Sequence, residues 1–145
     1  MKKLYYSSFT YLILALASGV IWREITKILD ITEKTALNVV HTHLFALGFI
    51  MFLVFMVLNH CFHIEQCQRF NTFFILYHVG VGLTALLMFI RGIVSIQEIR
   101  GDLVLSSGLD SSISGIAGIG HMILTVALVI LMLMLKEKLF EKKKA

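Results

Sequence analysis

Two histidines one residue apart, His41 and His43, lie in an apolar stretch long enough to cross a membrane. An ionisable side chain at that depth is costly, so it usually has a partner or a ligand. A neutral imidazole can ligate a haem iron or a copper ion. Residues two positions apart on a helix are rotated by about 200°, so the two rings cannot chelate one metal ion together. The pattern predicts two sites, or one site plus a structural contact.

Two further histidines, His78 and His121, lie inside other apolar stretches. At about 1.5 Å per residue, His41, His43 and His121 lie roughly 8 to 13 Å below one membrane face, and His78 lies about 12 Å from the other. Asp and Glu are absent from the interiors of these stretches, so a proton relay or cation pathway lacks its usual acidic members. We therefore interpret His41, His43 and His121 as candidate metal ligands. His78 is a further ligand or a residue that supports one.

A haem is favoured over a bare metal ion by the residues around these histidines. Arg23 and Arg91 lie at the predicted outer boundary, where a guanidinium group could bind a haem propionate. Apolar and aromatic side chains after His43 could pack against a porphyrin. Because the chain has no CxxCH motif, the haem would be non-covalent haem b or a related form.

The elements that must position these residues are membrane-spanning helices. The chain has 145 residues, of which 58% are hydrophobic and 15% charged, and its mean hydropathy is +0.87. A soluble core of this size cannot bury so much apolar surface. We expect an all-α integral membrane protein with a single domain over residues 1–145 and four spans, at about residues 4–22, 36–61, 70–90 and 112–135.

The distribution of Lys and Arg predicts the orientation. Eight of these residues fall at the end that carries both termini, and five fall in the two connections at the other end. The richer side is expected to be cytoplasmic, so both termini are inside, in a bacterial cytoplasmic membrane. The net charge of +4 comes mainly from a terminal Lys cluster, which fits contact with anionic lipid and not with nucleic acid.

Three alternative interpretations stay open. His60, Cys61, His63 and Cys67 resemble a loose set of metal ligands, although their spacing matches no closed zinc pattern and solvated His with inert, reduced Cys is the simpler interpretation. A copper-handling membrane protein would use the same imidazoles with Met, but the seven Met residues do not cluster. The third alternative is a cofactor-free membrane scaffold or assembly partner.

A run of small residues between Ser111 and Gly120 leads directly into His121. Small residues in membrane helices commonly permit close helix packing, within a chain or between copies. A flat ligand lying against this face, with His121 at its centre, is the alternative.

The segment from His41 to Phe49, HTHLFALGF, resembles the HxHxxxxGF type of segment in the catalytic subunit of haem-copper oxidases and in NnrS-like membrane proteins. Over nearly its full length, the chain also looks like a family of small bacterial four-span proteins. The residues that carry this second resemblance are Trp22-Arg23-Glu24, Arg91-Gly92-Ile93 and Ser114-Gly115-Ile116-Ala117-Gly118.

The oxidase resemblance implies a cofactor arrangement. In that family an HxH pair serves two haems from opposite faces of one helix, and twelve helices form three arcs of four. A four-span chain looks like one arc, so a homotrimer with haem between protomers is implied. The chain has no further His pair and no His-Tyr motif for a copper centre, so reduction of oxygen to water is not expected. The expected function is electron transfer with an unidentified redox partner, or sensing or handling of a diatomic gas or of haem. An enzymatic activity, if present, would be that of a haem-dependent membrane oxidoreductase.

Overall fold

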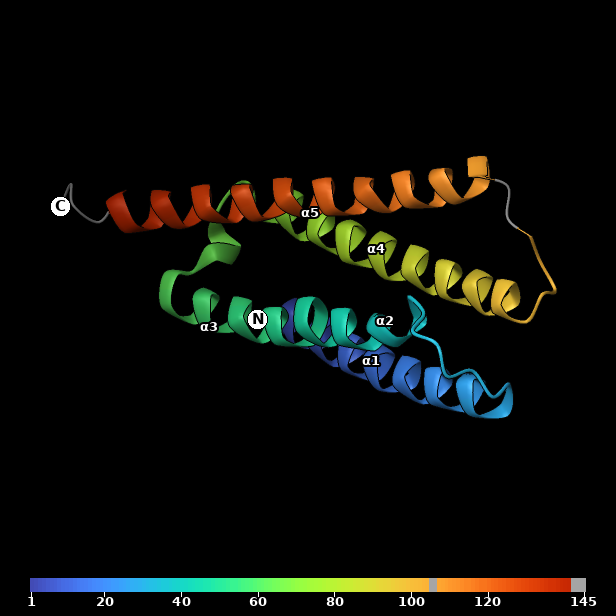
Figure 1. The fold of residues 1–145 in the computed structure, drawn as a ribbon. Coiled ribbons are helices and arrows are strands. Elements are labelled where there is room, and N and C mark those ends of the chain that lie inside the picture. The colour runs from blue at the N-terminus through green and yellow to red at the C-terminus, as the bar shows by residue number, and fades with distance from the viewer. Residues whose placement is uncertain (105–106, 142–145) are drawn as a thin grey trace.

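The computed structural model describes residues 1–104 and 107–141, and all the regular secondary structure in this part is helical (Figure 1). A π-helix, η1, joins α2 directly to α3, so the three segments form one continuous rod. The elements are α1 (Lys2–Ile28), α2 (Leu37–His43), η1 (Leu44–Ile50), α3 (Met51–Phe62), the short 3₁₀ helix η2 (Ile64–Gln66), α4 (Phe70–Ile99) and α5 (Ser107–Glu141).

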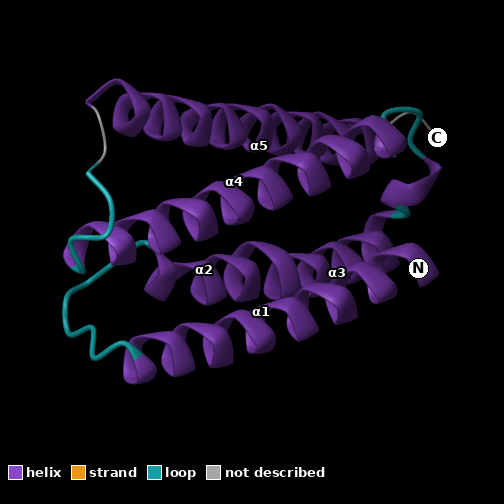
Figure 2. Ribbon diagram, turned by 90° about the vertical axis from the view of Figure 1, so that its right-hand side faces the viewer, coloured by secondary structure: helices purple, strands orange, loops and turns teal. Residues whose placement is uncertain are grey.

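The rods lie side by side in the order α1, α2–α3, α4, α5 (Figure 2). The rod made by α2, η1 and α3 packs against α1 on one side and α4 on the other, and α5 packs along α4. Within the described residues no Cα atom of α1 lies within 8 Å of α4 or α5. The molecule is therefore a row of four rods with α1 and α5 at its two ends.

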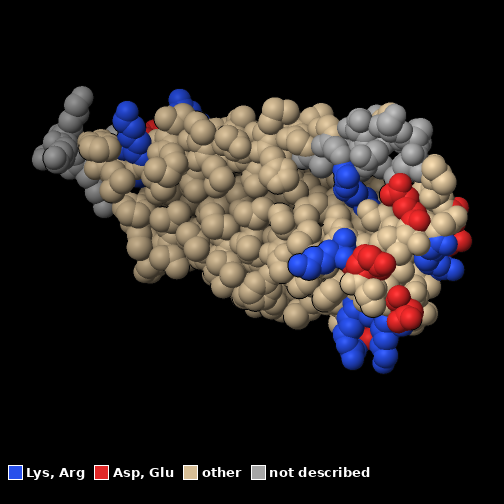
Figure 3. Space-filling view, viewed as in Figure 1, with Lys and Arg blue, Asp and Glu red and all other residues tan. Residues whose placement is uncertain are grey.

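Within the described residues, four helical rods are long and apolar enough to cross a membrane, in agreement with the four predicted spans. The uncharged surface forms a broad middle zone, and the Lys, Arg, Asp and Glu side chains gather at the two ends (Figure 3). Three helices, α1, α4 and α5, run several residues past the predicted apolar stretches, because polar residues at a membrane boundary can continue a helix. The α2–α3 rod agrees with its predicted stretch to within one residue at each end. The four candidate membrane spans are Lys2–Ile28, Leu37–Phe62, Phe70–Ile99 and Gly118–Phe140. This is the architecture of a multi-pass membrane protein.

Glycines permit the closest approaches between rods. A Cβ atom built on Gly92 of α4 would lie 2.4 Å from the backbone nitrogen of Leu37, where α2 begins. A Cβ atom on Gly120 of α5 would lie 2.5 Å from the Thr84 hydroxyl of α4. The predicted role of small residues in helix packing is therefore seen at Gly120.

The rest of the small-residue run behaves differently. Gly115 and Gly118 of α5 are exposed, and a Cβ atom on either would meet nothing within 4 Å. The side chains of Ser111, Ser114 and Ala117 lie outside the described residues.

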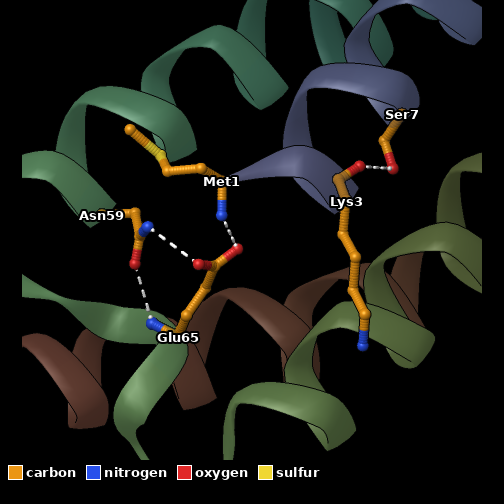
Figure 4. Close-up of polar contacts among 5 residues, drawn as sticks. All are labelled: Met1, Lys3, Ser7, Asn59 and Glu65. Atoms are coloured by element: carbon orange, nitrogen blue, oxygen red, sulfur yellow. Dashed lines mark hydrogen bonds and ion pairs between the residues drawn. The ribbon is translucent and has the colours of Figure 1, made fainter.

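The end of the molecule that carries the N-terminus is held by polar contacts (Figure 4). The Met1 amine forms an ion pair with Glu65 Oε1 in η2. Asn59 Nδ2 donates to Glu65 Oε2 at 3.1 Å, and the Glu65 backbone N–H donates to Asn59 Oδ1 at 2.8 Å. Nearby, Cys61 is exposed and Cys67 is buried, and neither forms a disulfide. Across the described part of the chain, no three His, Cys, Asp or Glu side chains are grouped so as to hold a metal ion.

The predicted orientation can be tested with two cysteines at opposite ends of the rods. Cys61 is an exposed native thiol at the end of α3, and Asp102 is exposed in the connection before α5. We expect a membrane-impermeant maleimide to label an Asp102→Cys, Cys61→Ser variant in intact cells and to leave Cys61 of the unmodified chain unlabelled, because positive charge is retained inside. The reverse pattern would invert the topology.

Candidate functional site

His41 lines a pocket of about 560 Å³ between α1 and the start of the α2–η1 rod. Its imidazole stacks on Trp22, with ring centroids 5.6 Å apart and planes 16° apart. The pocket is mostly apolar, includes the small residues Ala15 and Gly19, and has Arg23 on its wall. An aromatic imidazole and a guanidinium group are thus placed beside a mostly apolar surface.

The Nδ1 atom of His41 is buried and has no hydrogen-bond partner among the residues that the structure describes. A buried polar atom without a partner costs about 1 to 3 kcal/mol. Stacking on Trp22 therefore orients this ring, and hydrogen bonding within the described chain does not.

His43 is held differently. Its Nδ1–H donates to the backbone carbonyl of Val39, one turn earlier, at 3.0 Å. This bond places the proton on Nδ1 and leaves the Nε2 lone pair unprotonated, which is the usual arrangement of a metal-ligating histidine. The ring is half-buried and does not line the His41 pocket. The two imidazoles thus face different surroundings, as their spacing predicts.

His78 has both ring nitrogens committed to other side chains. Nε2 lies 3.0 Å from Ser7 Oγ, and Nδ1 lies 2.9 Å from the Tyr11 hydroxyl. The ring also packs against Phe52 and Phe74, with centroids at 4.8 and 4.5 Å. His78 therefore bridges α4 to α1, where the two backbones do not approach each other.

This bridge is expected to contribute to stability. Replacing His78 by leucine should lower the free energy of unfolding by about 2 kcal/mol, because the Ser7 and Tyr11 hydroxyls lose their partner in an apolar setting. Detergent-based denaturation of the purified protein would measure the change. His60→Leu is the matched control, since His60 is exposed at the end of α3. Equal stability of the two variants would show that the bridge contributes nothing.

The remaining candidates are more dispersed. Arg23 lines the His41 pocket, and its Nη1 donates to Glu24 Oε1 at 2.7 Å. Arg91 is half-buried on α4 and does not line that pocket. His121 is exposed on α5. The structure thus brings together His41 and Arg23, but not the full set of predicted residues.

The π-helix η1, which the sequence pattern did not predict, begins immediately after His43. A π turn accommodates an extra residue and loosens the backbone ladder. Two of its carbonyls accept side-chain hydrogen bonds from both flanking helices: Tyr77 of α4 donates to Leu47 O at 2.8 Å, and Ser8 of α1 donates to Phe49 O at 3.1 Å. The sequence feature that could have indicated these contacts is the presence of two hydroxyl side chains, Ser8 and Tyr77, inside otherwise apolar spans.

Comparison with known proteins gives one result. A family with the description "Protein of unknown function (DUF2871)" matches residues 1–138. No curated protein and no solved structure matches the chain.

Proposed function

The chain belongs to the DUF2871 family, and we propose that it binds b-type haem in the membrane through His41 and His43. The observation that supports this most is the hydrogen bond from His43 Nδ1–H to the Val39 carbonyl. This bond leaves the lone pair of His43 Nε2 available to a metal ion, and no described residue forms a hydrogen bond with that atom. A structural histidine in an apolar span would be expected to satisfy both nitrogens, as His78 does.

The His41 pocket supports the same proposal. Its mostly apolar wall, which includes the small residues Ala15 and Gly19, suits a flat macrocycle, and the Arg23 guanidinium could bind a propionate. Ligation through His41 Nε2 would leave the Nδ1 proton without an acceptor among the described residues. We therefore expect His43 to be the stronger ligand and His41 the weaker one.

The haem would supply one-electron chemistry or a binding position for a diatomic gas. Two axial imidazoles favour electron transfer to a redox partner, and one imidazole with an open position favours gas or haem sensing. In this proposal His78 holds α1 to α4, and the exposed His121 is a further candidate ligand from α5. Arg91 is a further candidate for a propionate at the same boundary.

A homo-oligomer, with three copies favoured, extends the proposal. The rods form an open row rather than a closed bundle, and His43 is only half-buried within one chain. A neighbouring copy could cover the free Nε2 atom, which would otherwise face lipid.

The decisive experiment is an absorption spectrum of the purified full chain, produced with haem supplied and then titrated with hemin. We expect a Soret band, and native mass spectrometry should show haem bound to an oligomer. If no Soret band develops, the haem proposal is wrong. Metal analysis then separates the alternatives, because bound copper would favour metal handling and no metal would favour a scaffold.

A further inference from the structure

A second pocket, the α1–α4 groove, has a volume of about 620 Å³, which is within the range of small-molecule sites. Its lining is almost entirely apolar and includes Leu14 of α1, Val40 of α2, and Gly82 and Phe89 of α4. Its polar lining residues include Thr10, Ser18 and a hydrogen-bonded cluster of three side chains, Ser7, Tyr11 and His78. The groove shares no residue with the His41 pocket, so binding of a ligand in the groove does not require haem.

The hydrogen bonds in this cluster fix where each proton lies. The Ser7 hydroxyl donates its single proton to the Lys3 carbonyl at 2.9 Å, so Ser7 Oγ can only accept from His78. His78 Nε2 therefore carries the proton of the neutral ring, and Nδ1 is an acceptor. The Tyr11 hydroxyl must then donate to Nδ1.

This order leaves the Tyr11 oxygen with lone pairs but no free proton. A ligand next to the Tyr11 oxygen can therefore form a hydrogen bond with it only by donating one. We propose that the α1–α4 groove binds a lipid-soluble aromatic molecule with a ring hydroxyl, of the alkylphenol and hydroquinone class, whose O–H donates to Tyr11. The aromatic side chains of Tyr6 and Phe89 also line the groove and suit a ring.

The depth of Tyr11 selects against ordinary lipid headgroups. Tyr11 lies nine residues beyond Lys2, the first residue of α1, which is about 14 Å along the helix. Headgroup hydroxyls stay at the membrane surface, whereas the hydroxyl of an otherwise apolar molecule can reach this depth. A groove that holds only acyl chains would not distinguish a hydroxyl from an ether.

The test uses two probes of nearly equal size, 4-octylphenol and its methyl ether 4-octylanisole, and the full chain in detergent. We expect the phenol to bind about tenfold more tightly than the ether, as one hydrogen bond would provide. Isothermal titration calorimetry measures both affinities. Equal affinities would overturn the proposal and leave a groove for acyl chains only.

Two variants sharpen the test. A side chain on Gly82 would project into the groove without meeting protein, because a Cβ atom there has nothing within 4 Å. Gly82→Leu should abolish binding of the phenol, and Gly118→Leu, at an equally open position on α5, should not. Binding that survives Gly82→Leu would also overturn the proposal.

The Ser7→Ala variant tests the proton order directly. Without Ser7, the His78 proton can move to Nδ1 and donate to Tyr11, which frees the tyrosine proton for the groove. The ratio of phenol to ether affinity should then fall toward one. An unchanged ratio would contradict the assignment of Tyr11 as the acceptor.

Discussion

Replacing His43 by alanine is expected to remove most of the bound haem, with at least a tenfold loss of the Soret band at equal protein concentration. The physical reason is that the hydrogen bond from His43 Nδ1–H to the Val39 carbonyl fixes the proton on Nδ1 and leaves Nε2 free to ligate iron. His41→Ala should weaken binding less, because its Nδ1 has no acceptor among the described residues. Imidazole added to the His43→Ala protein should restore part of the band.

The controls for this result lie at the other end of the same rod. His60 and His63 are exposed beside the α3–α4 connection, so His60→Ala and His63→Ala should retain the full band. A double variant, His41→Ala with His43→Ala, that keeps an unaltered spectrum would rule out the proposed ligands. A band lost equally in all four single variants would indicate misfolding rather than loss of a ligand.

The second large effect is expected from one methyl group. Gly92→Ala should destabilise the protein by about 3 kcal/mol, because the new Cβ would lie 2.4 Å from the Leu37 backbone nitrogen and α4 must move away from α2. Backbone atoms cannot adjust as the end of a flexible side chain does. Denaturation in detergent, followed by the loss of helical signal, measures the change.

Gly82→Ala is the matched control for that substitution. It makes the same change on the same helix, but its Cβ meets nothing within 4 Å. Alanine is favoured over glycine inside a helix by about 0.5 to 1 kcal/mol, so Gly82→Ala should be neutral or slightly stabilising. Similar stability of the two variants would show that the approach of α4 to α2 is not tight.

Much of the fold could be predicted because membrane spans are read from length and hydropathy. The number of spans and the helical class follow from four apolar stretches, since backbone groups in lipid must be paired within a helix or a barrel. The spacing of His41 and His43 also predicted two different surroundings. These properties depend only on residues that are close together in the sequence.

The partners of the histidines could not be predicted, because they come from other helices. Ser7 and Tyr11 lie 71 and 67 positions from His78, and nothing local indicates that they meet it. The same holds for Trp22, which stacks on His41, and for Gly92, whose closest neighbour starts another helix. Counting residues along each helix predicts how deep each histidine lies in the membrane, but it does not predict which neighbouring helix each ring faces.

The π-helix between His43 and Met51 has a consequence for comparing relatives of this chain. Within a regular α-helix, one residue inserted or removed rotates everything on one side of it by about 100° relative to the other side. A π turn absorbs one extra residue locally, so a relative with one residue fewer within η1 is expected to form an ordinary α turn there and to present both imidazoles to the same neighbours. The histidines of such a relative are therefore equivalent to His41 and His43, even though one residue fewer separates the HTH motif from the position of Phe52.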